Sequence, residues 1–195
     1  MRLRDAISLP DGRILRGRFD SLTILFHWTT VLAVLFLLLS GWSFDDLHHT
    51  PYYPPLVMVH RSLGLVVWGL TLTRFLWRHS LATFPRFPAD LPTIVRWAAK
   101  GSEYALYGLL IVQPLTGLGH TLFTGKPFAL FGVAIAPLAP HLPAVNEVFD
   151  TLHTLGGYGL AGLAGGHALA ALFHHVVRKD DVLEAMLPWA RRKRA

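Results

Sequence analysis

The sequence predicts an all-α membrane protein, a bundle of four transmembrane helices. Of its 195 residues, 52% are hydrophobic and only 15% are charged, a balance more typical of membrane proteins than of soluble domains. Four apolar runs are each close to the ~20 residues with which a helix crosses a bilayer. The runs are Leu22–Trp42, Leu56–Trp77, Tyr104–Leu122 and Thr151–Val177.

The positions of the basic residues predict the orientation. All 18 lysines and arginines except Arg61 and Lys126 lie before the first run, at or near the connection between the second and third, or after the fourth. Such residues gather on the cytoplasmic side, so both termini are expected in the cytoplasm. This segregation also explains the net charge of +6, and no nucleic-acid partner is expected. The chain divides into a basic N-terminal arm (1–20), a transmembrane domain (21–179) and a basic tail (180–195).

The first run follows an arginine-rich arm and has no small-residue cleavage site, so it is expected to be a retained helix. His27 stands about two turns inside it, and a histidine in hydrocarbon is costly and usually functional. The outer loop that follows holds Asp45, Asp46, His48 and His49, which suggest zinc. Adjacent histidines rarely chelate one ion from an extended chain, so we interpret this loop as solvated.

The second run places His60 near its outer end and Arg74 fourteen residues further along. Fourteen residues of a helix return to within roughly 40° of the same face and span ~21 Å. Arg74 is therefore expected on the His60 face, near the cytoplasmic interface. Two roles are open for it, an anchor that extends to the interface beside Arg78 or a partner for a cofactor carboxylate.

The basic connection before the third run contains three prolines and predicts an ordered cytoplasmic loop. The third run has no histidine in its interior, and Pro114 is expected to kink it. Gln113 beside the kink is more typical of a helix–helix contact than of a quinone contact. The next outer loop, which includes Pro127–Pro143, is apolar and proline-rich, and we expect a lid over an entrance for a lipid-soluble substrate.

The fourth run carries His153 and His167, again fourteen residues apart on one face, with glycines between them that allow a bulky group to approach. Because successive helices alternate in direction, His27 and His167 are expected at one depth, near the cytoplasm. His60 and His153 are expected at the other, near the outer face. Two pairs, each drawn from two helices, match two six-coordinate haems with imidazole on both sides.

Other uses of these histidines fit less well. A proton relay needs carboxylates inside the spans, where none lies, and zinc would lack further ligands at that depth. Structural hydrogen bonding explains one such histidine more easily than four. The chain has no cysteine, which excludes thiolate ligands, iron–sulfur clusters and covalently attached haem.

The chain resembles the bacterial cytochrome b561 family of small four-helix di-haem membrane proteins. The matching pieces are FHW at His27, HRSLG…TR from His60 to Arg74, YGLLIVQPLTGL in the third run, GKPFALFG in the outer loop, and most of the fourth run. They extend over most of residues 20–188. The resemblance implies two haem b per chain, with His27, His60, His153 and His167 as ligands, in a bacterial inner membrane.

The expected function is single-electron transfer between membrane quinone and a periplasmic small molecule, for which the resemblance also points to superoxide. Arg61 and Lys126 are expected to attract an anionic reactant to the outer haem, and no residue is assigned a catalytic role. One alternative is a haem-bearing anchor that transfers electrons for a separate periplasmic redox enzyme. Another is a haem-dependent sensor or transporter. The partners expected are quinone and lipid, and a homodimer is compatible with the sequence.

Overall fold

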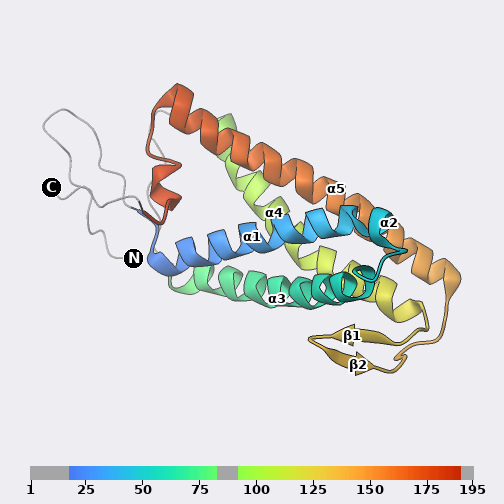
Figure 1. Cartoon of the computed structure of the whole chain (residues 1–195). Coiled ribbons are helices and arrows are strands. Elements are labelled where there is room, and N and C mark those ends of the chain that lie inside the picture. Colours follow the sequence, from blue (N-terminus) through green and yellow to red (C-terminus); the bar gives the residue numbers. More distant parts are fainter. Residues whose placement is uncertain (1–17, 83–91, 190–195) are drawn as a thin grey trace, which may run out of the picture.

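The computed structural model of the chain describes residues 18–82 and 92–189 (Figure 1). Four helices in these ranges are long and apolar enough to cross a membrane, which confirms the predicted helical bundle. They are α1 (Ser21–Trp42), α3 (Tyr53–Ser80), α4 (Thr93–Phe123) and α5 (Pro143–Phe173), and α5 continues into a π-helical turn, His174–Arg178. A short helix α2 (Phe44–Leu47) links α1 to α3.

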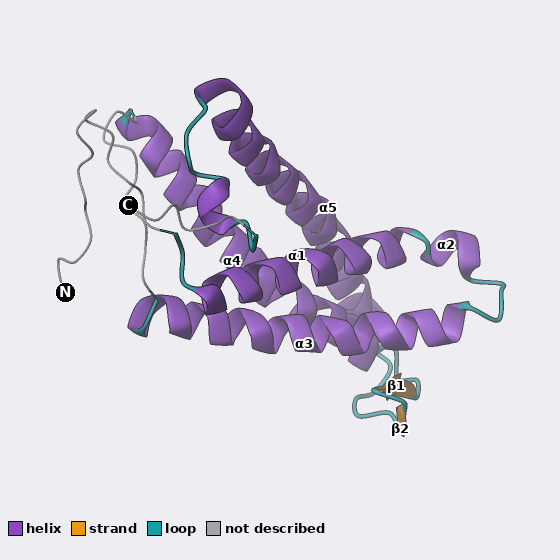
Figure 2. Cartoon of the chain, turned by 60° about the vertical axis from the view of Figure 1, so that its left-hand side comes forward, coloured by secondary structure: helices purple, strands orange, loops and turns teal. Residues whose placement is uncertain are grey.

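The bundle has two distinct ends. The start of α1 and the segment that follows α5 lie at one end, which we call the terminal end (Figures 1 and 2). The connection between α4 and α5 forms a small β-hairpin at the opposite end, which we call the hairpin end. Because α1 and α3 run in opposite directions, corresponding depths are reached early in one helix and late in the other.

Local capping explains where α1 begins. The Asp20 carboxylate accepts a hydrogen bond from the Thr23 backbone N–H at 2.9 Å, which satisfies an N–H group at the helix start. The indole N–H of Trp77 donates to the same carboxylate at 3.2 Å and joins the start of α1 to the end of α3. One carboxylate thus both starts a helix and holds two helices together.

Helix α4 is longer than its apolar run. The connection predicted as a loop includes residues 93–101, which are helical, whereas residues 83–91 lie outside the described ranges. The predicted span began too late in the sequence because hydropathy marks only the part of a helix that lies in hydrocarbon. The helix also continues through Pro114.

The buried core lies midway between the predicted ligand histidines. It is formed by Val34, Val67, Leu110 and Leu160, one residue from each long helix. Val34 and Val67 each follow their helix's histidine by seven residues, and Leu160 stands halfway between the two histidines of α5. In α5, which is described throughout, Leu160 is the only buried residue. The four helices therefore share one packed layer that separates two histidine levels.

The outer loop that is predicted to form a lid contains a β-hairpin. Strand β1 (Phe128–Leu130) pairs antiparallel with β2 (Val133–Ile135). Phe131 and Gly132 in the turn have φ of 51° and 81°, the positive values that a type I′ turn needs. The Phe131 N–H donates to the Ser62 hydroxyl at 2.8 Å, which secures the hairpin to α3. Strands of three residues are too short for an alternating pattern to reveal them.

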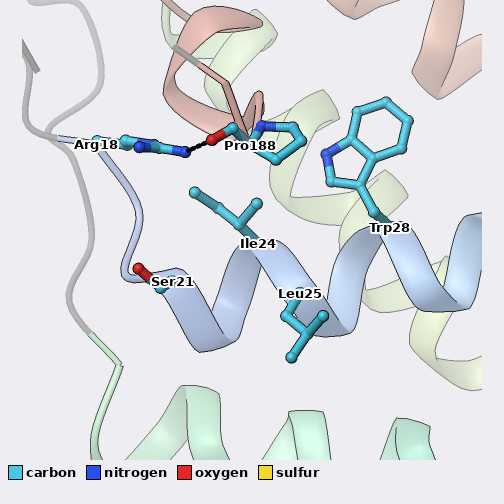
Figure 3. A pocket seen from close by; sticks show the side chains of 6 residues that line it. All are labelled: Arg18, Ser21, Ile24, Leu25, Trp28 and Pro188. Atoms are coloured by element: carbon cyan, nitrogen blue, oxygen red, sulfur yellow. Dashed lines mark hydrogen bonds between the residues drawn. The ribbon is translucent and has the colours of Figure 1, made fainter. Parts of the chain in front are cut away.

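At the terminal end the chain after α5 folds back onto the start of α1. The Arg18 guanidinium donates to the carbonyl oxygens of Leu187 and Pro188 at 2.7 and 2.6 Å. The Trp28 indole donates to the Met186 carbonyl at 2.8 Å. A pocket lies between this segment and α1, with Arg18, Trp28 and Pro188 around it (Figure 3). The predicted boundaries at residues 20 and 180 stay predictions, and residues 1–17 and 190–195 lie outside the described ranges.

A carboxylate stabilises the turn that follows α5. His174 Nδ1 donates to Asp180 Oδ2 at 2.7 Å, and the Val182 N–H donates to Oδ1 at 3.1 Å. Partial burial opposes ionisation, but these hydrogen bonds outweigh it and hold the pKa of the Asp180 carboxyl below its usual value. Nδ1 of His174 is thereby engaged in the turn.

Candidate functional site

Two pairs of histidine rings face each other across the bundle, and α5 contributes one ring to each. At the hairpin end, the ring centroids of His60 on α3 and His153 on α5 lie 6.2 Å apart, with 76° between the ring planes. At the terminal end, the centroids of His27 on α1 and His167 on α5 lie 6.3 Å apart, at 62°. The structure therefore brings together the same two pairs that helix depth predicts.

The separation within each pair suits two imidazoles on opposite sides of one metal ion. A metal–nitrogen bond of ~2.0 Å and ~1.1 Å from nitrogen to ring centre, taken on both sides, give ~6.2 Å between centroids. Aromatic rings in direct contact cover about 4.5–7 Å. The distance alone therefore fits both ligation of one metal ion and direct contact between two rings. The donor atoms and the surrounding space decide between them.

The donor set favours a haem over a bare metal ion. In the described parts of the chain, no group of three or more His, Cys, Asp or Glu side chains is placed to hold a metal. A structural zinc site uses about four protein ligands. Haem iron takes its equatorial nitrogens from the macrocycle and needs only axial ligands from the protein. Two facing imidazoles are a complete axial set.

The space beside α5 also suits a bulky group. Helix α5 packs along α4, but within the described residues it has no extended contact with α1 or α3. His167 is exposed although it lies in an apolar helix. A ring that is exposed, on a helix with no extended contact to α1 or α3 among the described residues, leaves room beside it for a flat cofactor.

Hydrogen bonds fix the protonation of the hairpin-end rings. His153 Nδ1 lies 3.0 Å from the Gln113 carbonyl oxygen, which can only accept, so the ring proton sits on Nδ1. His60 Nδ1 lies 2.8 Å from the Ser40 hydroxyl, which donates its own proton to the Leu37 carbonyl at 3.0 Å and therefore accepts from His60. Both rings are left with an unprotonated Nε2, as a metal ligand requires.

The terminal-end pair has a cation beside it instead. Arg74 Nη2 lies 3.4 Å from His27 Nδ1, and the Arg74 guanidinium carbon lies 5.4 Å from the Tyr107 ring centroid. These contacts turn Arg74 toward the interior of the bundle. The Tyr107 hydroxyl is buried and has no hydrogen-bond partner among the described residues. A guanidinium and an unpaired hydroxyl next to the ring pair suit a carboxylate such as a haem propionate.

The prokaryotic cytochrome b561 family matches this chain over residues 18–189. The chain belongs to that family. A probable superoxide oxidase, CybB of Yersinia pestis, is 34% identical over 180 residues, which cover 88% of this chain and 96% of the relative. Cytochrome b561 homologs 1 and 2 of Escherichia coli (strain K12) are 29% and 28% identical, covering 88% and 87% of this chain and 98% and 91% of their own lengths.

Membership of the b561 family makes this chain a multi-pass membrane protein of electron transfer, with b-type haem as its cofactor. The residues present fit that group. The ring centroids of each pair are spaced as two ligands of one iron would be, α5 has no extended contact with α1 or α3 in the described ranges, and the Arg74 guanidinium beside the terminal-end pair would bind a carboxylate of the group.

Helix α4 holds the hairpin-end ring of this b561 chain from the side. The Gln113 side-chain amide donates to the His153 carbonyl oxygen at 2.5 Å, which supports the helix–helix interpretation of Gln113. A Cβ at Gly117 would lie 2.7 Å from His153 Cε1, closer than packed atoms tolerate. Gly117 therefore leaves the room that the imidazole occupies.

The two predicted substrate contacts lie at the hairpin end. Arg61 is half-buried on α3 next to His60, and Lys126 is exposed in the connection between α4 and β1.

Sequence reasoning missed Ser40, Thr116 and Tyr107. Hydroxyl side chains in apolar helices commonly bond to their own backbone, and the Thr116 hydroxyl does so with the Gln113 carbonyl at 2.8 Å. Residue type alone therefore gave no sign that two of these hydroxyls also reach a histidine.

Proposed function

We propose that this b561 protein holds two b-type haems, one between His60 and His153 and one between His27 and His167, and passes single electrons between membrane quinone and a small molecule at the hairpin end. The observation that carries the proposal is the pair of facing imidazoles at each of two depths, 6.2 and 6.3 Å between centroids. Superoxide is the small molecule we favour, because a relative 34% identical to this chain is described as a probable superoxide oxidase.

The orientation that we propose places the terminal end in the cytoplasm and the hairpin end in the periplasm, across the inner membrane. Its support is the distribution of basic residues, all of which except Arg61 and Lys126 lie before α1, near the α3–α4 connection, or after α5.

Each part of the protein has a distinct task in this proposal. Haem supplies a one-electron redox centre. The two imidazoles of each pair would hold it, and the apolar core layer of Val34, Val67, Leu110 and Leu160 lies between the two levels. Arg74 would bind a carboxylate of the group at the terminal end. Arg61 and Lys126 raise the local concentration of an anionic reactant at the hairpin end.

Replacing Arg61 and Lys126 together with alanine is expected to slow reduction of the haems by superoxide, because two cations that attract the anion are removed. The deficit should be largest at low ionic strength and shrink as salt screens the charges of the unmodified protein. Stopped-flow absorbance measures the rate of haem reduction after mixing with superoxide. A separate mixing with ubiquinol measures the rate of haem reduction by quinol.

The matched control for this double variant is Arg96→Ala with Lys100→Ala, which removes one arginine and one lysine from α4 at the terminal end. It should leave the superoxide rate unchanged. If the His27–His167 haem changes first, or the Arg61 and Lys126 double variant reacts at the unmodified rate, the entry site lies at the terminal end near Arg74.

Replacing Arg74 with leucine is expected to weaken haem binding at the terminal end and to lower the reduction potential of whatever haem remains there. The guanidinium offers bidentate hydrogen bonds to a propionate, and its positive charge favours the reduced iron, which carries one positive charge fewer. Haem content and a spectroelectrochemical titration measure the two effects.

Arg78→Leu is the matched control, since Arg78 lies one turn further along α3 and is bound to Glu103 at 2.6 Å. Arg74→Lys should keep the charge but lose the bidentate geometry, with an intermediate result. Unchanged occupancy and potential in Arg74→Leu would leave Arg74 as an interfacial anchor.

A further inference from the structure

We propose that Ser40 and the Gln113 backbone carbonyl act as positioning groups that give the hairpin-end haem a lower reduction potential than the terminal-end haem. Electrons entering at the hairpin end would then pass downhill toward the terminal end, the first haem being oxidised as the second is reduced. The inference rests on the two haem sites of the proposed function and adds the direction between them.

The hairpin-end ring pair has a hydrogen-bond acceptor for each Nδ1 proton. Ser40 is buried, with 5% of its surface exposed, and its oxygen lies 2.8 Å from His60 Nδ1. The Ser40 proton is committed to the Leu37 carbonyl, so the lone pairs of its oxygen face the imidazole.

On the opposite ring, His153 Nδ1 lies 3.0 Å from the Gln113 carbonyl oxygen and 3.2 Å from the Thr116 hydroxyl. The Thr116 proton goes to that same carbonyl at 2.8 Å, so the threonine oxygen too can only accept from the ring. Both imidazoles at this end therefore donate through Nδ1 to fixed acceptors.

The terminal-end pair lacks this support. The described residues offer neither His27 nor His167 an acceptor for a proton on Nδ1. His27 Nδ1 instead lies 3.4 Å from Nη2 of the Arg74 guanidinium, which can only donate. Nδ1 of His27 thus lies next to a cation, whereas Nδ1 of each hairpin-end ring lies next to neutral oxygen atoms.

These differences act on the iron through its ligands. An acceptor at Nδ1 draws the proton away from the ring, makes the imidazole a stronger electron donor and stabilises the oxidised metal. A cation near the ligand does the opposite, because it favours the state with less positive charge. Arg61 is a cation next to His60 along α3 and opposes the effect at the hairpin end, but in the described structure it makes no hydrogen bond to either histidine. We therefore expect the acceptors at Nδ1 to have a larger effect than Arg61 on the reduction potential of the hairpin-end haem.

The test begins with a spectroelectrochemical titration of the purified protein, with the two steps assigned from variants that retain a single pair, His167→Ala and His60→Ala. The hairpin-end haem should titrate at the lower potential. Ser40→Ala should shift that step to a more positive potential and leave the terminal-end step in place, whereas Ser40→Thr, which keeps the hydroxyl, should restore the unmodified value.

Ser43→Ala is the matched control, because Ser43 is a serine of the same segment whose hydroxyl donates only to the Leu39 carbonyl at 2.8 Å. It should move neither step. If Ser40→Ala loses haem, Thr116→Val, which removes one acceptor and keeps the side-chain shape, provides the same measurement on His153.

A hairpin-end haem at the higher potential, or a step that stays in place in both Ser40→Ala and Thr116→Val, would overturn the inference. The proposed function fails in a different way. Purified protein with no haem, or with haem that is not low-spin, would contradict the two sites themselves, whereas two low-spin haems in the reverse order would contradict only the direction.

Discussion

Replacing His167 with alanine should leave one haem per chain in place of two, because the terminal-end site loses one of its two axial nitrogens and its only ligand on α5. Replacing His27 should remove the same spectral component. Replacing His60 or His153 should remove the other. A pyridine haemochrome assay on protein of known concentration counts the haems, and low-temperature absorbance spectra identify which component has gone.

His175→Ala is the matched control, since His175 is an exposed histidine further along the same chain segment, and it should keep both haems. The unmodified protein should resist carbon monoxide, because two imidazoles leave no open position on the iron. If His27→Ala and His60→Ala abolish the same component, the pairing is wrong.

Replacing Gly117 with alanine should disrupt the hairpin-end haem and spare the other. The new Cβ would lie 2.7 Å from Cε1 and 3.0 Å from Nδ1 of His153, so the ring must move away from the position that faces His60. Crowding of this kind costs about 1–3 kcal/mol, which corresponds to ~5- to 150-fold weaker binding of the group that depends on the ring. Haem titration of the apoprotein, followed by absorbance, measures the loss.

Gly108→Ala is the control for the change of glycine to alanine within α4, because a Cβ there meets nothing within 4 Å. It should bind both haems normally. Full occupancy and an unchanged low-spin spectrum in Gly117→Ala would show that the His153 ring does not need its present position for ligation.

The membrane spans and the depth of each histidine could be predicted because both depend on the chain alone. A run of ~20 apolar residues in a bilayer must satisfy its backbone internally and so becomes a helix. The rise of ~1.5 Å per residue then sets the level of every side chain along it. Alternating helix direction predicts which histidines share a level, and the structure places His27 with His167 and His60 with His153.

Helix ends and the hairpin were less accessible from the sequence. High hydropathy marks only residues within the hydrocarbon, so the apolar run did not include the first turns of α4. The turn at Phe131 places a bulky residue at positive φ, which sequence rules reserve for glycine or asparagine. Its N–H is held by Ser62, a residue 69 positions away, and no local pattern reports a contact of that range.

What the sequence by itself determined is therefore the class of protein, the number of spans and the levels of four histidines. Only the tertiary structure decided what surrounds each ring. Ser40 meets His60 and Gln113 meets His153 because each helix has a particular rotation about its own axis and a particular distance from its neighbours. Rotation and distance come from packing between helices, through the layer of Val34, Val67, Leu110 and Leu160 and the glycines that allow close approach. They involve residues tens of positions apart, so local propensity and spacing do not contain them.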